Sequence, residues 1–133
     1  MPVKNATRKT LIASSSRVAD SVFGRAIGLM FSRPTKTAMI LEFSRDSPIS
    51  LHTFFVFFPI DIILVDSRMR VVEMHVRMRP FTTFVARKVA RLVIELPAGT
   101  IATSRTRVGD RIELLRVVEK RTGNGRRITV CRA

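Results

Sequence analysis

The amino-acid sequence predicts a single mainly β domain, a sandwich or barrel of short strands with one short N-terminal helix. Most apolar runs are short and are separated by turn residues such as Gly, Pro, Asp and Ser. Only one stretch has the spacing of a helix. A chain of 133 residues can bury a hydrophobic core as one domain. Many short strands with frequent turns favour an all-β sandwich or barrel.

The first predicted elements are a short strand and the helix. Residues 9–14 form a short run that is typical of a strand. Apolar residues then recur at steps of three to five positions from Val18 to Met30, which places them on one face of a helix. Gly28 weakens the end of this helix.

The other predicted elements are strands. The most apolar segment holds four of the nine Phe between residues 54 and 58 and ends at Pro59, which cannot donate to a central strand ladder. A turn is expected at 44–48, and the segment 84–90 is compatible with either a helix or a strand. Strands are expected over residues 37–43, 51–58, 60–65, 71–76, 92–96, 112–118 and 128–131.

The charge of the chain is its most unusual bulk property. It has 24 basic residues against 10 acidic ones, a net charge of +14, and most of the basic residues are arginine. This balance favours association with a polyanion such as a nucleic acid. The alternative is a thermophile-like composition, because the chain has no Gln and only two Asn. The sequence leaves both interpretations open.

The remaining bulk features predict a cytoplasmic protein without a membrane segment. The single cysteine, Cys131, cannot form a disulfide within the chain, which fits a reducing compartment. No uncharged run reaches the roughly 20 residues of a membrane-spanning helix. Residues 1–17 lack the apolar core of a signal peptide.

Four short motifs in a fixed order resemble a known family. They are Gly28-Leu29-Met30-Phe31, Pro59-Ile60-Asp61, Glu95-Leu96-Pro97-Ala98-Gly99 and Val108-Gly109-Asp110. In this order and spacing the chain resembles an archaeal member of the uncharacterised domain of unknown function 192 family, over residues 19–115. The resemblance implies a jelly-roll-like β-sandwich or partly open barrel with one short N-terminal helix. It implies no established activity.

The same resemblance suggests how the chain is organised. Residues 1–133 form one β-rich domain, with the family-like core at 19–115 and a C-terminal strand or hairpin extension at 116–133. Thr122-Gly123-Asn124-Gly125 in this extension is typical of a hairpin turn. The bacterial form of the family has Trp-Met-Lys-Asn-Thr where this chain has only Phe and Val, at 54–58. Roles of those polar side chains therefore do not transfer to this sequence.

Two carboxylates and one histidine are the candidate catalytic residues. Asp61 either lines a pocket, as a general base or cation ligand, or accepts hydrogen bonds from loop amides or an arginine such as Arg25. Glu95 precedes the turn at 97–99. It either supplies a second carboxylate for acid–base work on a sugar-like substrate or anchors that turn. His52 pairs with Asp61 if the chain folds back.

No motif in the sequence predicts a metal or another cofactor. Two histidines, His52 and His75, and one cysteine are too few for a structural zinc site. The glycines form neither of the common phosphate-binding motifs. The alternative for either histidine is a packing or hydrogen-bonding role, and Cys131 lacks the local partners of a nucleophile.

Arginine occurs three times in the pattern Arg-x-Arg. In an extended strand, residues i and i+2 share a face, so each pair would present two guanidinium groups side by side to a phosphate. The alternative is a solvated, arginine-rich strand face. The candidate ligand-binding residues are Arg68, Arg70, Arg77, Arg79, Arg105 and Arg107.

Three functions are compatible with these residues. The first is a non-catalytic binding module for an anionic or small polar ligand, with the arginine pairs in contact and with Asp61, Glu95 and His52 shaping a pocket. The second is an enzyme that uses Asp61 or Glu95 in acid–base chemistry. The third is an arginine-rich domain that assembles with a partner or associates with nucleic acid. The sequence does not determine the oligomeric state.

Overall fold

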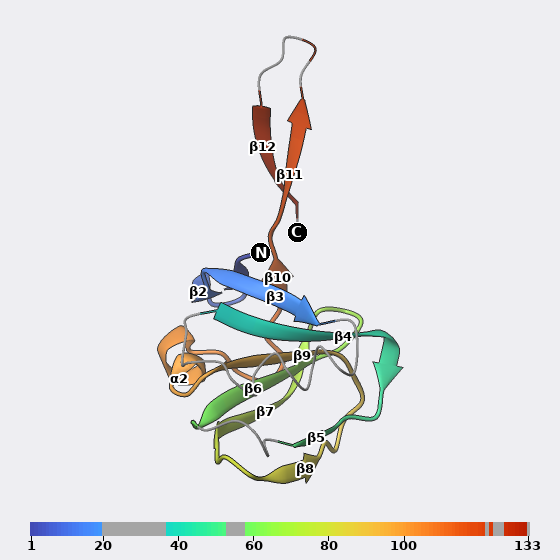
Figure 1. Cartoon of the computed structure of the whole chain (residues 1–133), viewed down its shortest axis with the longest axis vertical. Coiled ribbons are helices and arrows are strands. Elements are labelled where there is room, and N and C mark those ends of the chain that lie inside the picture. Colours follow the sequence, from blue (N-terminus) through green and yellow to red (C-terminus); the bar gives the residue numbers. More distant parts are fainter. Residues whose placement is uncertain (20–36, 53–57, 122, 124–126, 133) are drawn as a thin grey trace.

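The computed structural model describes residues 1–19, 37–52, 58–121, 123 and 127–132. Their strands form a five-stranded sheet, a three-stranded sheet and two two-stranded sheets (Figure 1). The protein is therefore mainly β, as the sequence predicts. The elements are, in chain order, β1 (Val3–Asn5), β2 (Thr10–Ala13), β3 (Ser15–Ala19), β4 (Thr37–Ser47), β5 (Ser50–His52), β6 (Ile60–Val65), β7 (Val71–Met78), β8 (Thr83–Val85), β9 (Ala90–Pro97), α2 (Thr100–Ser104), β10 (Ile112–Leu114), β11 (Arg116–Arg121) and β12 (Arg127–Arg132).

The five-stranded sheet is the centre of the fold. Its strand order is β3-β4-β9-β6-β7. The pair β3–β4 is parallel and the other pairs are antiparallel. All six residues of β6 are buried, which requires cover on both faces of the sheet. Five of the six residues of Ile60–Val65 are apolar, the exception being Asp61, and an apolar run without alternation is typical of a strand covered on both faces.

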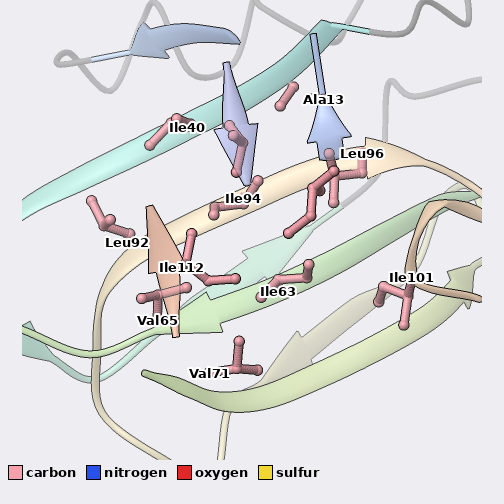
Figure 2. Close-up of a cluster of buried hydrophobic side chains, with 13 residues drawn as sticks. Ala13, Ile40, Ile63, Val65, Val71, Leu92, Ile94, Leu96, Ile101 and Ile112 are labelled. Carbon is pink, nitrogen blue, oxygen red and sulfur yellow. The ribbon is translucent and has the colours of Figure 1, made fainter. Parts of the chain in front are cut away.

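One face of this sheet packs against the three-stranded sheet, whose order is β10-β1-β2, and against α2. Figure 2 shows the shared core, in which Ile40, Ile63 and Ile94 of the large sheet meet Ile112 of β10 and Ile101 of α2. We call this side the α2 face. Its remaining buried residues are Val3, Ile12, Ala13, Ala38, Val65, Val71, Leu92 and Leu96.

The opposite face packs against the segment that carries the β5–β8 pair, and we call it the β5–β8 face. Ile49, just before β5, and Phe84 of β8 pack with the side chains of this face. Its buried residues from the large sheet are Met39, Leu41, Ile60, Ile62, Leu64, Met78, Ala90 and Val93. Adjacent residues along β6 and β9 therefore belong to different cores.

The structure corrects the position of the helix. The sequence predicts an N-terminal helix that begins near Val18, but strand β3 includes Val18 and Ala19, and residues 20–30 lie outside the described residues. The described helix, α2, lies near the C-terminal end. It follows Gly99, whose φ of 93° turns the chain out of β9. A helix of five residues is too short to produce a periodic sequence pattern.

The described sheets are open and do not close into a barrel. Strands β3 and β7 form the edges of the large sheet, and β2 and β10 form those of the smaller one. The parallel β3–β4 pair differs from the antiparallel strands of a jelly roll. In the part of the chain that the structure describes, no helix is long and apolar enough to cross a membrane.

Most predicted strands are confirmed, but several bounds differ, and the sequence did not predict β1 or β3. The strand predicted at 37–43 continues to Ser47, so the turn predicted at 44–48 begins too early. The single strand predicted at 112–118 is two strands, β10 and β11. The ambiguous segment 84–90 contributes to β8 and β9. Residues 53–57, in the predicted strand 51–58, lie outside the described residues.

The core assignment is testable with Ile94, whose side chain is 0% exposed in the middle strand of the large sheet. We expect Ile94→Ala to lower the free energy of unfolding by about 2–5 kcal/mol, because it removes buried methyl groups and leaves a cavity. Urea unfolding measures this loss. Val85→Ala, at a position that is 75% exposed, is the control and should change the free energy by less than about 0.5 kcal/mol. Equal losses would contradict the assignment.

Candidate functional site

Asp61 is a buried carboxylate that binds backbone amides. It lies in β6 with 0% of its surface exposed. Its Oδ1 accepts a hydrogen bond from the amide of Arg77 at 2.9 Å. Its Oδ2 accepts from the amides of Gly99 at 3.1 Å and Ile101 at 2.9 Å. One side chain thus connects β6 with β7, with the turn after β9 and with α2.

A β-bulge in β7 makes this arrangement possible. The register between β6 and β7 shifts next to Asp61, so that Val76 and Arg77 oppose one residue of β6. Arg77 has a φ of 51°, and its amide donates to Asp61 rather than to a strand partner. These contacts correspond to the structural alternative for Asp61, an acceptor for loop amides.

Glu95 lies on the other side of the sheet from Asp61. In the β6–β9 pairing, Asp61 is opposite Leu96, and Glu95 is opposite Ile62. Successive residues of a strand point to opposite faces, so Asp61 lies on the α2 face and Glu95 on the β5–β8 face. The structure therefore does not bring the two carboxylates into one pocket. The backbone of His52 lies in β5, and its side chain lies outside the described part of the chain.

Glu95 is an unusual carboxylate because it is partly buried and has no hydrogen-bond or ion-pair partner among the described residues. Burial raises the pKa of Glu95 to about 7. The role of turn anchor, predicted for Glu95 as an alternative, belongs to Asp61, because Asp61 accepts the Gly99 amide.

A histidine–carboxylate pair lies on the same face as Glu95. His75 Nε2 is 2.6 Å from Glu73 Oε2, and the His75 ring lies 4.2 Å from that of Phe84. Glu73 also accepts hydrogen bonds from the amides of Arg87 and Lys88. Burial alone would raise the pKa of Glu73, but the hydrogen bonds from His75 and the two amides lower it below the usual value.

The sequence reasoning missed Glu73, although the spacing of Glu73 and His75 puts both on one face of a strand. The two candidate acid–base groups are nevertheless separate. His75 pairs with Ile62, which in turn pairs with Glu95. Two strand spacings, about 10 Å, separate the backbones of Glu95 and His75, and the described hydrogen bond of the His75 ring is to Glu73.

A hollow lies between β2 and the turn that leads into α2, on the α2 face of the sheet. Its volume is about 480 Å³, and its lining contains no charged side chain among the described residues. No group of three or more described His, Cys, Asp and Glu side chains could hold a metal ion. The lining residues are Leu11, Ile12, Ala13, Ser14, Pro97, Ala98, Gly99, Thr100, Thr103 and Ser104.

A second buried carboxylate, Asp110, organises the turns that carry arginines. Only 3% of its surface is exposed. Its Oδ2 accepts hydrogen bonds from Asn5 Nδ2 at 2.8 Å, Arg8 Nε at 3.2 Å and the amide of Arg107 at 2.9 Å. Burial alone would raise the pKa of Asp110, but these hydrogen bonds and the Arg8 charge lower it below the usual value.

Backbone hydrogen bonds attach the turn between β6 and β7 to the same point. The amide of Val71 donates to the Asp110 carbonyl at 2.9 Å, and the amide of Gly109 donates to the Val71 carbonyl at 2.8 Å. Arg70 and Arg111 form an isolated β-bridge. Segments 6–9, 66–70 and 105–111 therefore meet at one place, and we call them the arginine turns. Their exposed basic residues are Arg8, Lys9, Arg68, Arg70, Arg105, Arg107 and Arg111.

The Arg-x-Arg pairs do not have the extended geometry that the sequence predicts. Arg68 lies in the turn between β6 and β7, and Arg105, with a φ of 56°, follows α2. Arg77 lies in the bulge at the other end of β7 from Arg70. Tertiary contacts thus bring the pairs 68/70 and 105/107 to the same end of the molecule, and the pair 77/79 lies apart from them.

The sequence matches the family described as uncharacterised ACR, domain of unknown function 192 (DUF192), over residues 3–114. This protein belongs to the DUF192 family. The match confirms the family that the sequence motifs indicate, and it ends just before β11.

Relatives in this family share much of the chain. It is 36% identical over 98 residues to the UPF0127 protein PH1112 of Pyrococcus horikoshii, which covers 73% of this chain and 84% of that protein. It is 31% identical over 115 residues to the UPF0127 protein PF1050 of Pyrococcus furiosus, covering 86% and 98%. A crystal structure of a protein of unknown function from Novosphingobium aromaticivorans has the same fold, with a TM-score of 0.74, 24% identity and coverage of 86% and 84%.

The structural role of Asp61 predicts a large loss of stability in Asp61→Ala. Three amide donors lose their acceptor, so we expect the free energy of unfolding to fall by about 2–4 kcal/mol. Urea unfolding measures the loss. Glu42→Ala is the control, because its carboxylate is exposed and 3.5 Å from Arg91, a contact that contributes about 1 kcal/mol or less. A fully stable Asp61→Ala variant would contradict this role.

The raised pKa of Glu95 predicts a pH effect on stability. The folded protein holds this proton more tightly than the unfolded chain, so Glu95 makes the free energy of unfolding fall as the pH rises from about 4.5 to about 7. Glu95→Gln should remove this fall. Urea unfolding of both proteins at several pH values measures the difference. Parallel curves for the two proteins would show that Glu95 has an ordinary pKa.

Proposed function

We propose that this protein is a non-catalytic binding module for a polyanion and that the arginine turns form its binding surface. The single observation that supports this proposal is the group of hydrogen bonds around Asp110, which we call the Asp110 node. It holds three segments far apart in the sequence together and leaves their basic residues at the surface.

The electrostatics of the node favour binding of an anion. Its buried carboxylate, Asp110, already accepts three hydrogen bonds. Asp66 accepts the amides of Arg68 and Arg70. Both acidic side chains are thus occupied by local donors, and only Arg8 among the turn arginines forms an ion pair with a described residue. Arg70 Nη1 also donates to the Gly109 carbonyl at 3.3 Å. The turn arginines without an ion pair keep donors for charge-assisted hydrogen bonds to phosphate.

The distribution of carboxylates favours a binding module over an enzyme. Acid–base work on a sugar-like substrate would need Asp61 and Glu95 at one pocket, and the two lie on opposite faces of the sheet. Both carboxylate oxygens of Asp61 also accept hydrogen bonds from backbone amides. The arginine turns need no catalytic partner, because phosphate contacts position a ligand through charge and hydrogen bonds alone.

A triple substitution tests this function. We expect Arg70→Gln, Arg107→Gln and Arg111→Gln together to weaken binding of a fluorescent single-stranded DNA oligonucleotide by about tenfold or more near 100 mM salt. The slope of log K against log salt should shrink by about 2, since each lost phosphate contact removes roughly 0.7. Fluorescence anisotropy at several salt concentrations measures both quantities.

The matched control removes three exposed arginines from elsewhere, by Arg17→Gln, Arg45→Gln and Arg87→Gln. It lowers the net charge equally and should reduce the affinity much less. Equal losses in the two triple variants would show that only total charge matters. Unchanged binding in the first variant would also refute the proposed surface. Urea unfolding of both variants checks that the fold is retained.

A further inference from the structure

The C-terminal strands β11 and β12 form a ribbon that is separate from the other sheets. They pair only with each other among the described strands, in antiparallel register from Arg116 opposite Arg132 to Arg121 opposite Arg127. Figure 1 shows the ribbon projecting from the rest of the described chain. It begins two residues after the part that matches the DUF192 family, which ends at residue 114.

A two-stranded ribbon on its own is at most marginally stable in water. Its sequence is nevertheless regular and strongly charged. The two strands hold five basic residues, three in β11 and two in β12, against one acidic residue, Glu119. A ribbon with this charge gains most from a surface of opposite charge that contacts it along its length.

The pairing register divides these charges unequally between the two faces of the ribbon. Arg116 is opposite Arg132, and Lys120 is opposite Ile128. Arg116 and Lys120 are four positions apart in β11, and residues an even number of positions apart share a face. Arg116, Lys120 and Arg132 therefore share one face. The other face carries Arg121, Arg127 and the acidic Glu119. The first face has three basic residues and no acidic one, and we call it the basic face.

We propose that the ribbon binds duplex DNA, with its basic face in the major groove. The major groove of B-form DNA is about 12 Å wide and admits a two-stranded β-ribbon. Six residue pairs at about 3.4 Å each make the ribbon about 20 Å long. The major groove of A-form RNA is too narrow and deep for such a reader.

A second copy of this chain is a less suitable occupant. Exposed strand edges do pair with one another. Two of these ribbons, however, would bring five basic residues of one copy against five of the other, and like charges oppose that contact. A DNA duplex supplies the opposite charge along the whole length of the ribbon.

The proposal concerns a different segment from the arginine turns, so the two can fail separately. The experiment is a fluorescence-anisotropy titration of the full chain with a 20-base-pair DNA duplex and with an RNA duplex of the same sequence. The DNA duplex is about three times as long as the ribbon. Lys120→Gln with Arg132→Gln changes the basic face. Arg121→Gln with Arg127→Gln is the control, since it removes the same charge from the other face.

We expect the basic-face variant to weaken binding of the DNA duplex by about tenfold or more near 150 mM salt. The salt slope should shrink by about 2, because each lost contact to B-form DNA removes roughly 0.9. The control should lose less than about threefold, and the affinity for the RNA duplex should change little in either variant.

Three results would overturn the proposal. The first is equal DNA affinity for the basic-face variant and the unmodified protein. The second is an equal loss for the DNA and RNA duplexes, which would indicate contact with phosphates alone. The third is a dimer in analytical ultracentrifugation that the basic-face substitutions dissociate, which would make this face an interface between copies. The proposed function is tested separately, by the binding of single-stranded DNA to the variant with Arg70→Gln, Arg107→Gln and Arg111→Gln.

Discussion

The carboxylate of Asp110 is the interaction on which the basic end of this molecule depends. It is buried, and a buried carboxylate is stable only when hydrogen bonds replace its lost hydration. Asn5, Arg8 and the amide of Arg107 supply those bonds, so the N-terminal hairpin and the loop after α2 must meet at this point. The β6–β7 turn joins them through the main chain of Asp110 and Gly109. The position of the exposed arginines follows from this meeting of turns.

A second constraint is that the five-stranded sheet is covered on both faces. Neighbouring residues of β6 and β9 then serve different cores, and a carboxylate in either strand faces one core or the other. Asp61 faces α2 and gives its oxygens to three amides. Glu95 faces the other side without a partner among the described residues, and its pKa is raised to about 7. The fold thus uses Asp61 and Asp110 as structural acceptors and leaves Glu95 as the carboxylate whose protonation is sensitive to pH near neutrality.

Much of this arrangement follows from local sequence, and the rest depends on long-range pairing. The segment Ile60–Val65, apolar except at Asp61, predicts β6 at its observed bounds, since a strand with both faces buried needs no alternation. The opposite orientation of Asp61 and Glu95 depends on the β6–β9 register, which no local pattern contains. The arginine turns are the clearest case, because the Arg-x-Arg spacing suggested extended strands. The pairs 68/70 and 105/107 instead lie in turns that long-range hydrogen bonds bring together, at Gly109 and at Asp110, which is more than 100 residues from Asn5. Helix α2 was missed because five residues carry no periodic signal.

Chemical-shift mapping by NMR tests the central claim most directly, namely that the basic surface around Asp110 binds polyanions while the carboxylates of the sheet serve the fold. Backbone amide spectra of the full chain would be recorded during titration with a short single-stranded DNA. The account predicts that the largest chemical-shift changes occur at the amides of Arg70, Gly109 and Arg111. The amide resonances of residues around Glu95 and His75 should not shift. Shifts centred on Glu95 and His75, with the arginine turns unaffected, would contradict it and place the binding site on the β5–β8 face.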